Sequence, residues 1–243
     1  MNKMKTIFTI IVLTLVMSRS YAIKTIQSVD SILYKSFITE NKVLAIALIK
    51  GLNNENPSLE NTFLLLKAQY ALLYFNTYYN TDKELHNAYI GKAKANADKL
   101  IVNKKYLTEV YVMKACLYGI EIGNSPMKGM YLGSSINKCI TKAMKCNKLY
   151  PYVWATKGHS LVSKPSVFGG DINEGIKLYD LSIKLYENNN SNGNWEYLDT
   201  YLQIAIAYLN INNKDKAKEY LNKILKVEPE FQLAKWYLMN RCN

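Results

Sequence analysis

The sequence predicts an all-α protein built as an array of antiparallel helix pairs, with about eleven helices and no strands of note. A helix signature centred on a small residue recurs at near-constant spacing, which is typical of stacked repeats. The small residues are Ala68, Ala115, Gly158 and Ala205. Helix-breaking residues are few, with 11 glycines and 5 prolines, and a hydrophobic content of 49% is ample for a core.

Residues 1–22 are predicted to be a secretory signal peptide. Two lysines precede an apolar run over residues 7–17, and the small residues Ser20 and Ala22 fit the positions that a signal peptidase reads. The run is about half as long as the roughly 20 residues that span a bilayer. We therefore expect cleavage after Ala22. The product would be a soluble chain, periplasmic or secreted, with no lipid anchor and no transmembrane segment.

The remaining chain, residues 23–243, is expected to form a single helical domain. An irregular first pair is predicted over 23–56, broken near Thr39. Repeats follow over about 58–231, and a capping helix over about 230–240 is expected to cover the last repeat, because an array has an apolar end to shield.

One unit of 34 residues, 198–231, carries the repeat pattern in full. Its small residue Ala205 lets the second helix of the pair approach closely at Ala217, while larger apolar side chains fill the space around the crossing. Pro229 fits the start of the next helix, where its missing N–H costs nothing. The larger residues of the pattern are Tyr201, Ile204, Tyr208, Leu221 and Ile224.

These residues and offsets resemble the tetratricopeptide repeat (TPR), most strongly over 198–231 and more loosely before residue 110. The resemblance implies a right-handed superhelical array, a TPR-like solenoid, in which the first helix of each pair lines a concave groove. It also implies a protein that binds partners. Lysine replaces leucine in three of the four signatures and alanine replaces glycine in three, not the same three, so the family's ligands cannot be carried over to this chain.

Two insertions lengthen the repeats, over 121–129 and 163–171. The second contains Phe168, Gly169, Gly170 and Asp171, and it resembles exported bacterial TPR proteins with a Pro-x-x-Phe-Gly-Gly-Asp loop. A weaker resemblance is to the periplasmic TPR component of TRAP-type transporters. Capping boxes are predicted where Asp171 precedes Glu174 and where Thr81 precedes Glu84.

The charge of the chain is +12, and the excess lies in residues 81–150, which carry 12 basic and 5 acidic groups. After cleavage Arg241 is the single arginine, and phosphate recognition favours the guanidinium fork, so no nucleic acid partner is expected. The lysines are interpreted as solvated helix faces, with an acidic small molecule as the alternative. The cysteines are buried apolar residues or disulfide partners, and they are Cys116, Cys139, Cys146 and Cys242.

The residues of an enzyme are not apparent in the sequence. Two histidines, His86 and His159, are about 70 positions apart, and the sequence lacks the common metal, nucleophile and nucleotide motifs. The pair Gly169 and Gly170 could cradle an anion at a helix N-terminus. A sharp turn capped by Asp171 is the simpler interpretation. We expect no catalysis, no cofactor and no metal.

The function that this pattern favours is a non-catalytic interaction scaffold of the periplasm or cell envelope, which binds a protein or peptide in its concave groove. The alternative is a small-molecule binding accessory of a periplasmic transport system, similar to the TPR component of TRAP-type transporters. Each groove tyrosine has a second interpretation as a core residue. The predicted groove residues are Tyr111, Tyr118, Trp154, Lys157, His159, Tyr201 and Tyr208.

Overall fold

The computed structural model describes residues 25–78, 81–189, 191 and 193–242, and the predicted signal peptide lies outside them. This part of the chain forms eleven α-helices and two 3-10 turns, with no strand, which confirms the predicted all-α fold. The elements are α2 (Ile26–Ile38), α3 (Lys42–Asn53), α4 (Leu59–Tyr78), α5 (Lys83–Val102), α6 (Leu107–Asn124), η1 (Pro126–Lys128), α7 (Gly129–Cys146), α8 (Pro151–Val162), η2 (Ser166–Phe168), α9 (Ile172–Asn188), α10 (Trp195–Asn210), α11 (Lys214–Val227) and α12 (Gln232–Arg241).

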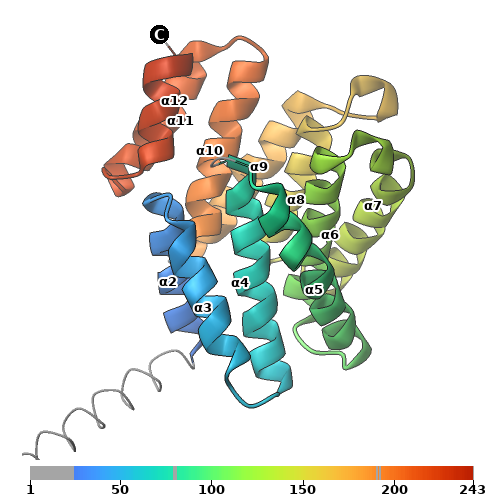
Figure 1. Cartoon of the computed structure of the whole chain (residues 1–243). Coiled ribbons are helices and arrows are strands. Elements are labelled where there is room, and N and C mark those ends of the chain that lie inside the picture. The colour runs from blue at the N-terminus through green and yellow to red at the C-terminus, as the bar shows by residue number, and fades with distance from the viewer. Residues whose placement is uncertain (1–24, 79–80, 190, 192, 243) are drawn as a thin grey trace, which may run out of the picture.

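The helices pack as successive antiparallel pairs, from α2 with α3 to α10 with α11 (Figure 1). Each first helix also contacts the first helix of the next pair, which gives the array its curvature. The last helix, α12, covers α11 and buries Leu233 and Ala234. One large cluster of buried apolar side chains extends from Val29 in α2 to Cys242 after α12, and a smaller cluster of Ala115, Cys139 and Ile140 lies between α6 and α7.

Local hydrogen bonds explain where the helices begin. The predicted capping residue Thr81 is not the N-cap of α5, because Asp82 takes that place and accepts from the backbone N–H groups of Glu84 and Leu85 at 2.9 and 3.0 Å. A carboxylate is the stronger acceptor for these free N–H groups. Pro229 also differs from the expectation. It lies in the turn between α11 and α12, where the N–H of Phe231 donates to the carbonyl of Glu228 at 3.1 Å.

The small residues of the four signatures are all buried in the array. Gly158 marks the closest crossing, between α8 and α9. A Cβ atom there would lie 2.8 Å from the carbonyl oxygen of Gly175 and 3.1 Å from the ring of Tyr179. The two helices can therefore cross this closely only because Gly158 on α8 and Gly175 on α9 both lack a side chain. Ala217, opposite Ala205, is likewise fully buried.

The first helices of the pairs form a closed inner ring instead of an open groove. α10 contacts α8 and also α2, so that α2, α4, α6, α8 and α10 surround a common centre. Trp195, at the start of α10, fills this centre. Its ring centroid lies 5.1 to 6.1 Å from the rings of aromatic residues on three other helices. These are Phe37, Tyr70, Tyr74, Phe75 and Tyr152.

Candidate functional site

A stripe of polar side chains runs along the inner face of α10. Glu196, Asp199 and Gln203 are three and four residues apart, so they share one face of the helix. All three are buried. A buried carboxylate requires hydrogen bonds or a counter-charge, and tyrosine hydroxyls from other helices supply the hydrogen bonds here.

Asp199 lies in the middle of the ring. Tyr74 donates to its Oδ2 atom at 2.7 Å, and Tyr78 donates to its Oδ1 atom at 3.1 Å. The amide of Gln203 donates to the same Oδ1 atom at 3.3 Å and also contacts the Tyr78 hydroxyl. Burial raises the pKa of Asp199 to about 6, although these hydrogen bonds oppose the shift. The four side chains therefore join α4 to α10.

Glu196 lies one turn closer to the start of α10. The hydroxyls of Tyr186 and Tyr150 donate to its Oε2 atom at 3.2 and 3.5 Å. Burial raises the pKa of Glu196 to about 7, while the nearby Lys67 lowers it and Asp30 raises it again. A carboxyl group in this environment gains or loses its proton near neutral pH.

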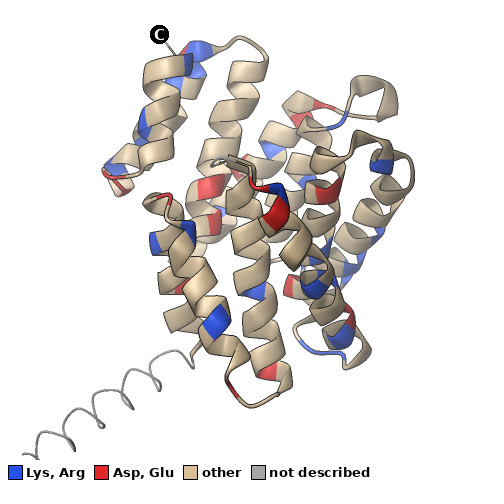
Figure 2. Ribbon diagram, in the orientation of Figure 1, with Lys and Arg blue, Asp and Glu red and all other residues tan. Residues whose placement is uncertain are grey.

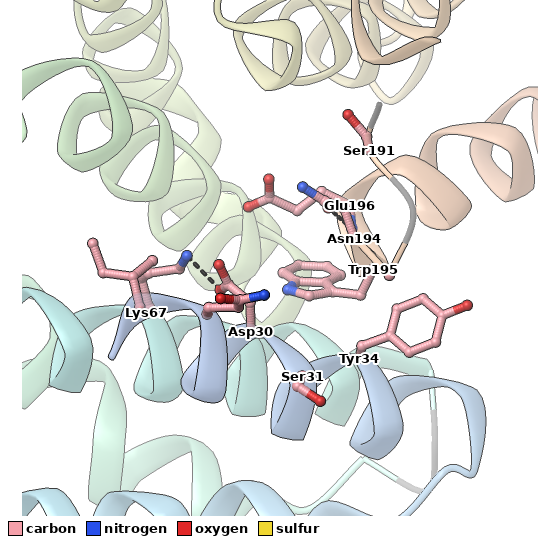
Figure 3. Close-up of a pocket in the computed structure, with 11 residues that line it drawn as sticks. Asp30, Ser31, Tyr34, Lys67, Ser191, Asn194, Trp195 and Glu196 are labelled. Atoms are coloured by element: carbon pink, nitrogen blue, oxygen red, sulfur yellow. Dashed lines mark hydrogen bonds and ion pairs between the residues drawn. The ribbon is translucent and has the colours of Figure 1, made fainter. Parts of the chain in front are cut away.

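A cavity of about 600 Å³ opens beside Glu196, between α2, α4 and the start of α10. We call it the seam cavity, because it lies where the ring closes. Figure 3 shows Glu196, Asp30 and Lys67 pointing toward one another on one side of Trp195, with the Nζ atom of Lys67 at 2.5 Å from Oδ1 of Asp30. Its main lining residues are Asp30, Tyr34, Lys67, Asn194, Trp195 and Glu196.

His159 is the only predicted groove residue that faces the ring interior. Its Nδ1 atom lies 3.4 Å from the Tyr179 hydroxyl and its Nε2 atom lies 3.2 Å from the Ser163 hydroxyl. The imidazole is accessible to solvent, yet the surrounding helices exclude enough water to lower its pKa, although its hydrogen bond with Gln203 opposes the shift. The acidic residues at the start of α9 have other partners, since Asp171 accepts from the backbone N–H of Glu174 and Glu174 pairs with Lys177.

Four other predicted groove residues lie on the outer side of the ring, toward α5 and α7. Tyr111 and Tyr118 are half-buried, with the amino groups of lysines 5.2 to 5.9 Å from their rings. The Nε1 atom of Trp154 donates to the carbonyl of Lys148 at 2.8 Å. Lys157 lines a second cavity, of about 240 Å³, between α7 and α8. These residues lie on a helix face that contacts the second helices of the pairs, so the structure does not bring them together in an inner groove.

Tyr201 and Tyr208 also lie away from the ring interior, against α9 and α11. The Tyr201 hydroxyl donates to Glu187 at 3.0 Å, and the Tyr208 ring stacks on Tyr220 with centroids 5.7 Å apart. Tyr220 in turn donates to Asp180 at 3.0 Å. These tyrosines hold the last two helix pairs together, so they too differ from the predicted groove.

The predicted loop after α8 is an ordered turn. Gly169 has a φ of +82°, and a Cβ atom on Gly170 would lie 1.8 Å from the carbonyl oxygen of Lys164, so both positions need glycine. Asp171 caps α9 by accepting from the backbone N–H of Glu174 at 2.9 Å. The Glu174 side chain pairs with a lysine instead of completing the box. Phe168 is exposed at the tip.

The four cysteines carry free thiols. Cys116 contacts the Thr156 hydroxyl at 3.6 Å in the ring, and burial raises the pKa of its thiol to about 11, which disfavours the nucleophilic thiolate. Among the described residues no group of three potential metal ligands occurs. None of the helices in that part of the chain has the length and hydropathy of a membrane span.

Sequence reasoning missed the residues of the ring and the seam cavity. The sequence does contain a signal, because acids at positions 196 and 199 interrupt an otherwise apolar helix at helical spacing. Lys67 and Asp30 gave no such signal, since their contact depends on how α2 and α4 pack.

Comparison with known proteins identifies the repeat and the fold. Residues 198–231 match the tetratricopeptide repeat model. No curated protein sequence matches the chain. Among solved structures, the chain is similar to a thermophilic TPR protein of Thermus thermophilus, at 15% identity and a TM-score of 0.60, with 88% of this chain and 97% of that one covered. The predicted TPR-like array is confirmed. The resemblance of the 163–171 loop to exported bacterial TPR proteins, and that of the chain to the TPR component of TRAP-type transporters, stay predictions.

Proposed function

We propose that the protein is a non-catalytic interaction scaffold that is exported to the periplasm or cell envelope and binds an acidic segment of a protein partner. Arrays of this fold generally make binding surfaces rather than active sites. The ring interior is filled by the chain's own aromatic side chains, so a partner must use another face. The observation that carries the proposal is a set of exposed apolar side chains beside a helix that has no acidic residue.

The helix in question is α7, which has lysines and no aspartate or glutamate. Its exposed side carries Met130, which is 85% accessible, Tyr131 in the next position, and three lysines further along. Figure 2 shows lysines spaced along this helix at the outer side of the array. We call this surface the α7 face, and it consists of Met130, Tyr131, Lys138, Lys142 and Lys145.

Two neighbouring turns extend the α7 face. η1 exposes Met127, at 76% accessibility, and η2 exposes Val167 and Phe168, at 83% and 74%. Because α6 and α8 are successive first helices that pack against each other, their following turns lie at the same end of the array (Figure 1). Large apolar side chains gathered at exposed turns are typical of protein-binding surfaces.

The charge of the α7 face favours an acidic partner. Lysines without acidic neighbours attract negative charge and increase the rate of encounter with an acidic segment. The rarity of arginine in the chain disfavours a phosphate backbone as the partner. An acidic peptide with apolar side chains would complement both the lysines of the α7 face and the exposed apolar side chains of the two turns.

Affinity capture from the native cell envelope tests the proposal, with three versions of residues 23–243 as bait. Wild type and a control in which Lys83, Lys92 and Lys99 of α5 become glutamate are expected to recover the same acidic protein. The variant with Lys138, Lys142 and Lys145 changed to glutamate is expected to lose it. With purified partner, binding should weaken about tenfold as salt is raised. Equal recovery by all three baits would refute the α7 face.

Export has its own test. Mass spectrometry of the chain isolated from its native cells should find a protein that begins at Ile23 in the envelope or periplasmic fraction. A chain that begins at Met1 and fractionates with the cytosol contradicts export, whatever the outcome of the capture experiment.

A second candidate function is a small-molecule binding accessory of a transport system. The observation that favours it is the seam cavity, whose volume of about 600 Å³ lies within the usual range for small-molecule sites. A stoichiometric metabolite released from the native protein under denaturing conditions would support this candidate. A native protein that is free of metabolites and holds an acidic protein would support the scaffold.

A further inference from the structure

We propose that the seam cavity binds a small organic cation with a primary ammonium group, held between the Glu196 carboxylate and the ring of Trp195. The inference goes beyond the interaction scaffold, because it concerns a different surface from the α7 face. It also gives the small-molecule candidate a ligand class.

The charges that line the cavity do not balance. Lys67 is paired with Asp30 at 2.5 Å, so these two groups neutralise each other. Glu196 then leaves one negative charge in excess when it is ionised. A ligand ammonium would supply the missing positive charge, and a charge-assisted hydrogen bond to a carboxylate is among the strong ones in proteins.

One oxygen of Glu196 is available to a ligand. Both of its hydrogen bonds, from Tyr186 and Tyr150, go to Oε2. Oε1 accepts none from the part of the chain that the structure describes, and it is not among the fully enclosed atoms, so it is open to the cavity that the residue lines. An accessible carboxylate oxygen at a cavity wall, with no partner among the described residues, can accept a hydrogen bond from a ligand donor.

Trp195 supplies the second contact. Its ring lines the cavity next to the charged groups, as Figure 3 shows. Aromatic neighbours on three helices hold the indole in place. An ammonium group over an indole face gains from its electron density, and tryptophan is the best residue for this interaction. A fixed aromatic wall beside a carboxylate is therefore a suitable arrangement for an amine.

An anion fits the cavity less well, although a lysine and a helix N-terminus lie there. The first backbone N–H groups of α10 are already used, because the Asn194 side chain accepts from Glu196 and Tyr197 at 2.8 and 3.3 Å. Lys67 is engaged by Asp30. An anion would have to displace these partners and approach two carboxylates.

Protonation of Glu196 should control the affinity for the amine. The charged and titratable groups that face Glu196 are Lys67, Asp30, Asp199, Tyr186 and Tyr150. Together with burial, they place the pKa of Glu196 at about 7 in the free protein. Below this pH the carboxyl is neutral, so binding is expected to weaken about tenfold between about pH 8 and pH 6.

The test uses the processed chain, residues 23–243, and its three tryptophans as reporters. Indole N–H signals in ¹H–¹⁵N spectra are followed during titration with n-butylammonium, with an acetylated Gly-Lys-Gly amide, and with n-butyrate. The Trp195 signal is expected to move to saturation with a Kd of about 1 mM or below for the amine. Trp154 and Trp236, which do not line the cavity, serve as internal controls.

The first two probes distinguish the source of the ammonium group. Saturation by butylammonium and not by the peptide assigns a free small amine, and tighter binding of the peptide assigns a lysine side chain. Both results support an ammonium site. Binding of butyrate in preference to the amine, or no movement of the Trp195 signal with any probe, would overturn the proposal.

Variants then assign the contact. Glu196→Gln keeps an acceptor for the tyrosines and is expected to weaken amine binding at least about tenfold. Its matched control is Glu187→Gln on α9, which should leave binding unchanged. Lys67→Gln removes the competing cation and should tighten binding several-fold. If Glu196→Gln fails to fold, the Lys67→Gln variant still tests whether the cavity binds an ammonium group. Looser binding after Lys67→Gln would identify an anion site and refute the proposal.

The proposed partner site on the α7 face and the proposed amine site in the seam cavity can be refuted independently of each other. The variant with three α7 lysines reversed is expected to bind butylammonium like wild type, because α7 does not line the seam cavity. Loss of the partner protein with retained amine binding leaves the seam proposal intact, and the reverse result leaves the scaffold intact.

Discussion

Two equally buried glutamates show how the two sides of this array differ. Glu121, in α6, and Glu196, in α10, are 7% and 9% accessible. Lys94 and Lys128 donate to Glu121 at 2.8 and 3.1 Å, whereas tyrosine hydroxyls donate to Glu196. Burial by itself raises the pKa of both. The two lysines outweigh it at Glu121 and hold that pKa below its usual value, while the pKa of Glu196 rises to about 7.

The difference extends to how the two sides are built. On the α6–α9 flank, the helices pack mainly within the sequential pairs α6 with α7 and α8 with α9, and charged groups find partners nearby in the chain. The other side, where α2 and α4 meet the C-terminal helices, is called the seam, and it joins distant parts of the chain. The hydrogen bond from Tyr74 to Asp199 spans 125 residues, and that from Tyr34 to Glu228 spans 194. The flank is thus a regular repeat. The seam contains buried carboxyl groups, Glu196 and Asp199, that no lysine of the described residues pairs with, and binding sites often contain such groups.

The largest expected effect comes from removing the aromatic residue that closes the ring. Trp195→Ala should lower the free energy of unfolding by about 4 kcal/mol, because it leaves a cavity among five aromatic side chains. Trp154→Ala, on the flank, is the matched control and should cost about 1 kcal/mol, since Trp154 is only half-buried. Urea unfolding of both variants measures the difference. Equal losses would contradict a tightly packed seam.

On the flank, stability is expected to depend on the close crossing of α8 and α9. Gly158→Ala places a methyl group 2.8 Å from the carbonyl oxygen of Gly175, and neither backbone can yield freely. The free energy of unfolding should fall by about 2–3 kcal/mol. Gly119→Ala in α6 is the control, because its Cβ atom meets nothing within 4 Å. It should stabilise the protein by about 0.5–1 kcal/mol, and a loss there would show that the crossing is not the cause.

The two glutamates should give stability profiles of opposite sign. The folded pKa of Glu196 is raised, so its ionised form opposes folding. Glu196→Gln should increase the free energy of unfolding by about 2 kcal/mol at about pH 8, and this gain should shrink as the pH falls and vanish below about pH 4, near the ordinary pKa of a glutamate. The folded pKa of Glu121 is lowered, so its ionised form stabilises. Glu121→Gln should cost about 1 kcal/mol at neutral pH, allowing for screening of its half-exposed lysines.

Urea titrations at several pH values check both profiles. The effect of Glu121→Gln should disappear as the pH falls through the folded pKa of Glu121, whereas that of Glu196→Gln should decline from about pH 7 downward and disappear below about pH 4, where Glu196 is protonated in both the folded and the unfolded chain. Parallel profiles for the two variants would contradict the opposite environments of the two carboxyl groups.

The helix array was predictable because its signals are local. A small residue at Ala205 and its partner Ala217 define a pair within one segment of 34 residues, and the same spacing recurs upstream. Helix caps are equally local, although Asp82 took the place of Thr81. Closure of the ring was not predictable, since it depends on small rotations summed over five pairs, and no single segment of the sequence shows that sum.

The candidate site was missed for a related reason. Tyr111 and Tyr118 are seven residues apart and share a helix face, but spacing does not say which face looks inward. On α8 the inward face holds Tyr152, Thr156 and His159, of which only the histidine was predicted. Orientation is a property of the packed pairs, so tyrosine counts alone could not place the groove.

The smallest expected effect concerns a local contact on the flank. Asp171→Ala removes the acceptor for the backbone N–H of Glu174 at the start of α9 and should lower the free energy of unfolding by about 1 kcal/mol. Asp171→Asn keeps an acceptor and should cost clearly less, which thermal unfolding of both variants can resolve. If the flank is stabilised by local contacts, Asp171→Ala should leave the Trp195 indole signal unchanged. A shift of that signal would show that the flank and the seam are coupled.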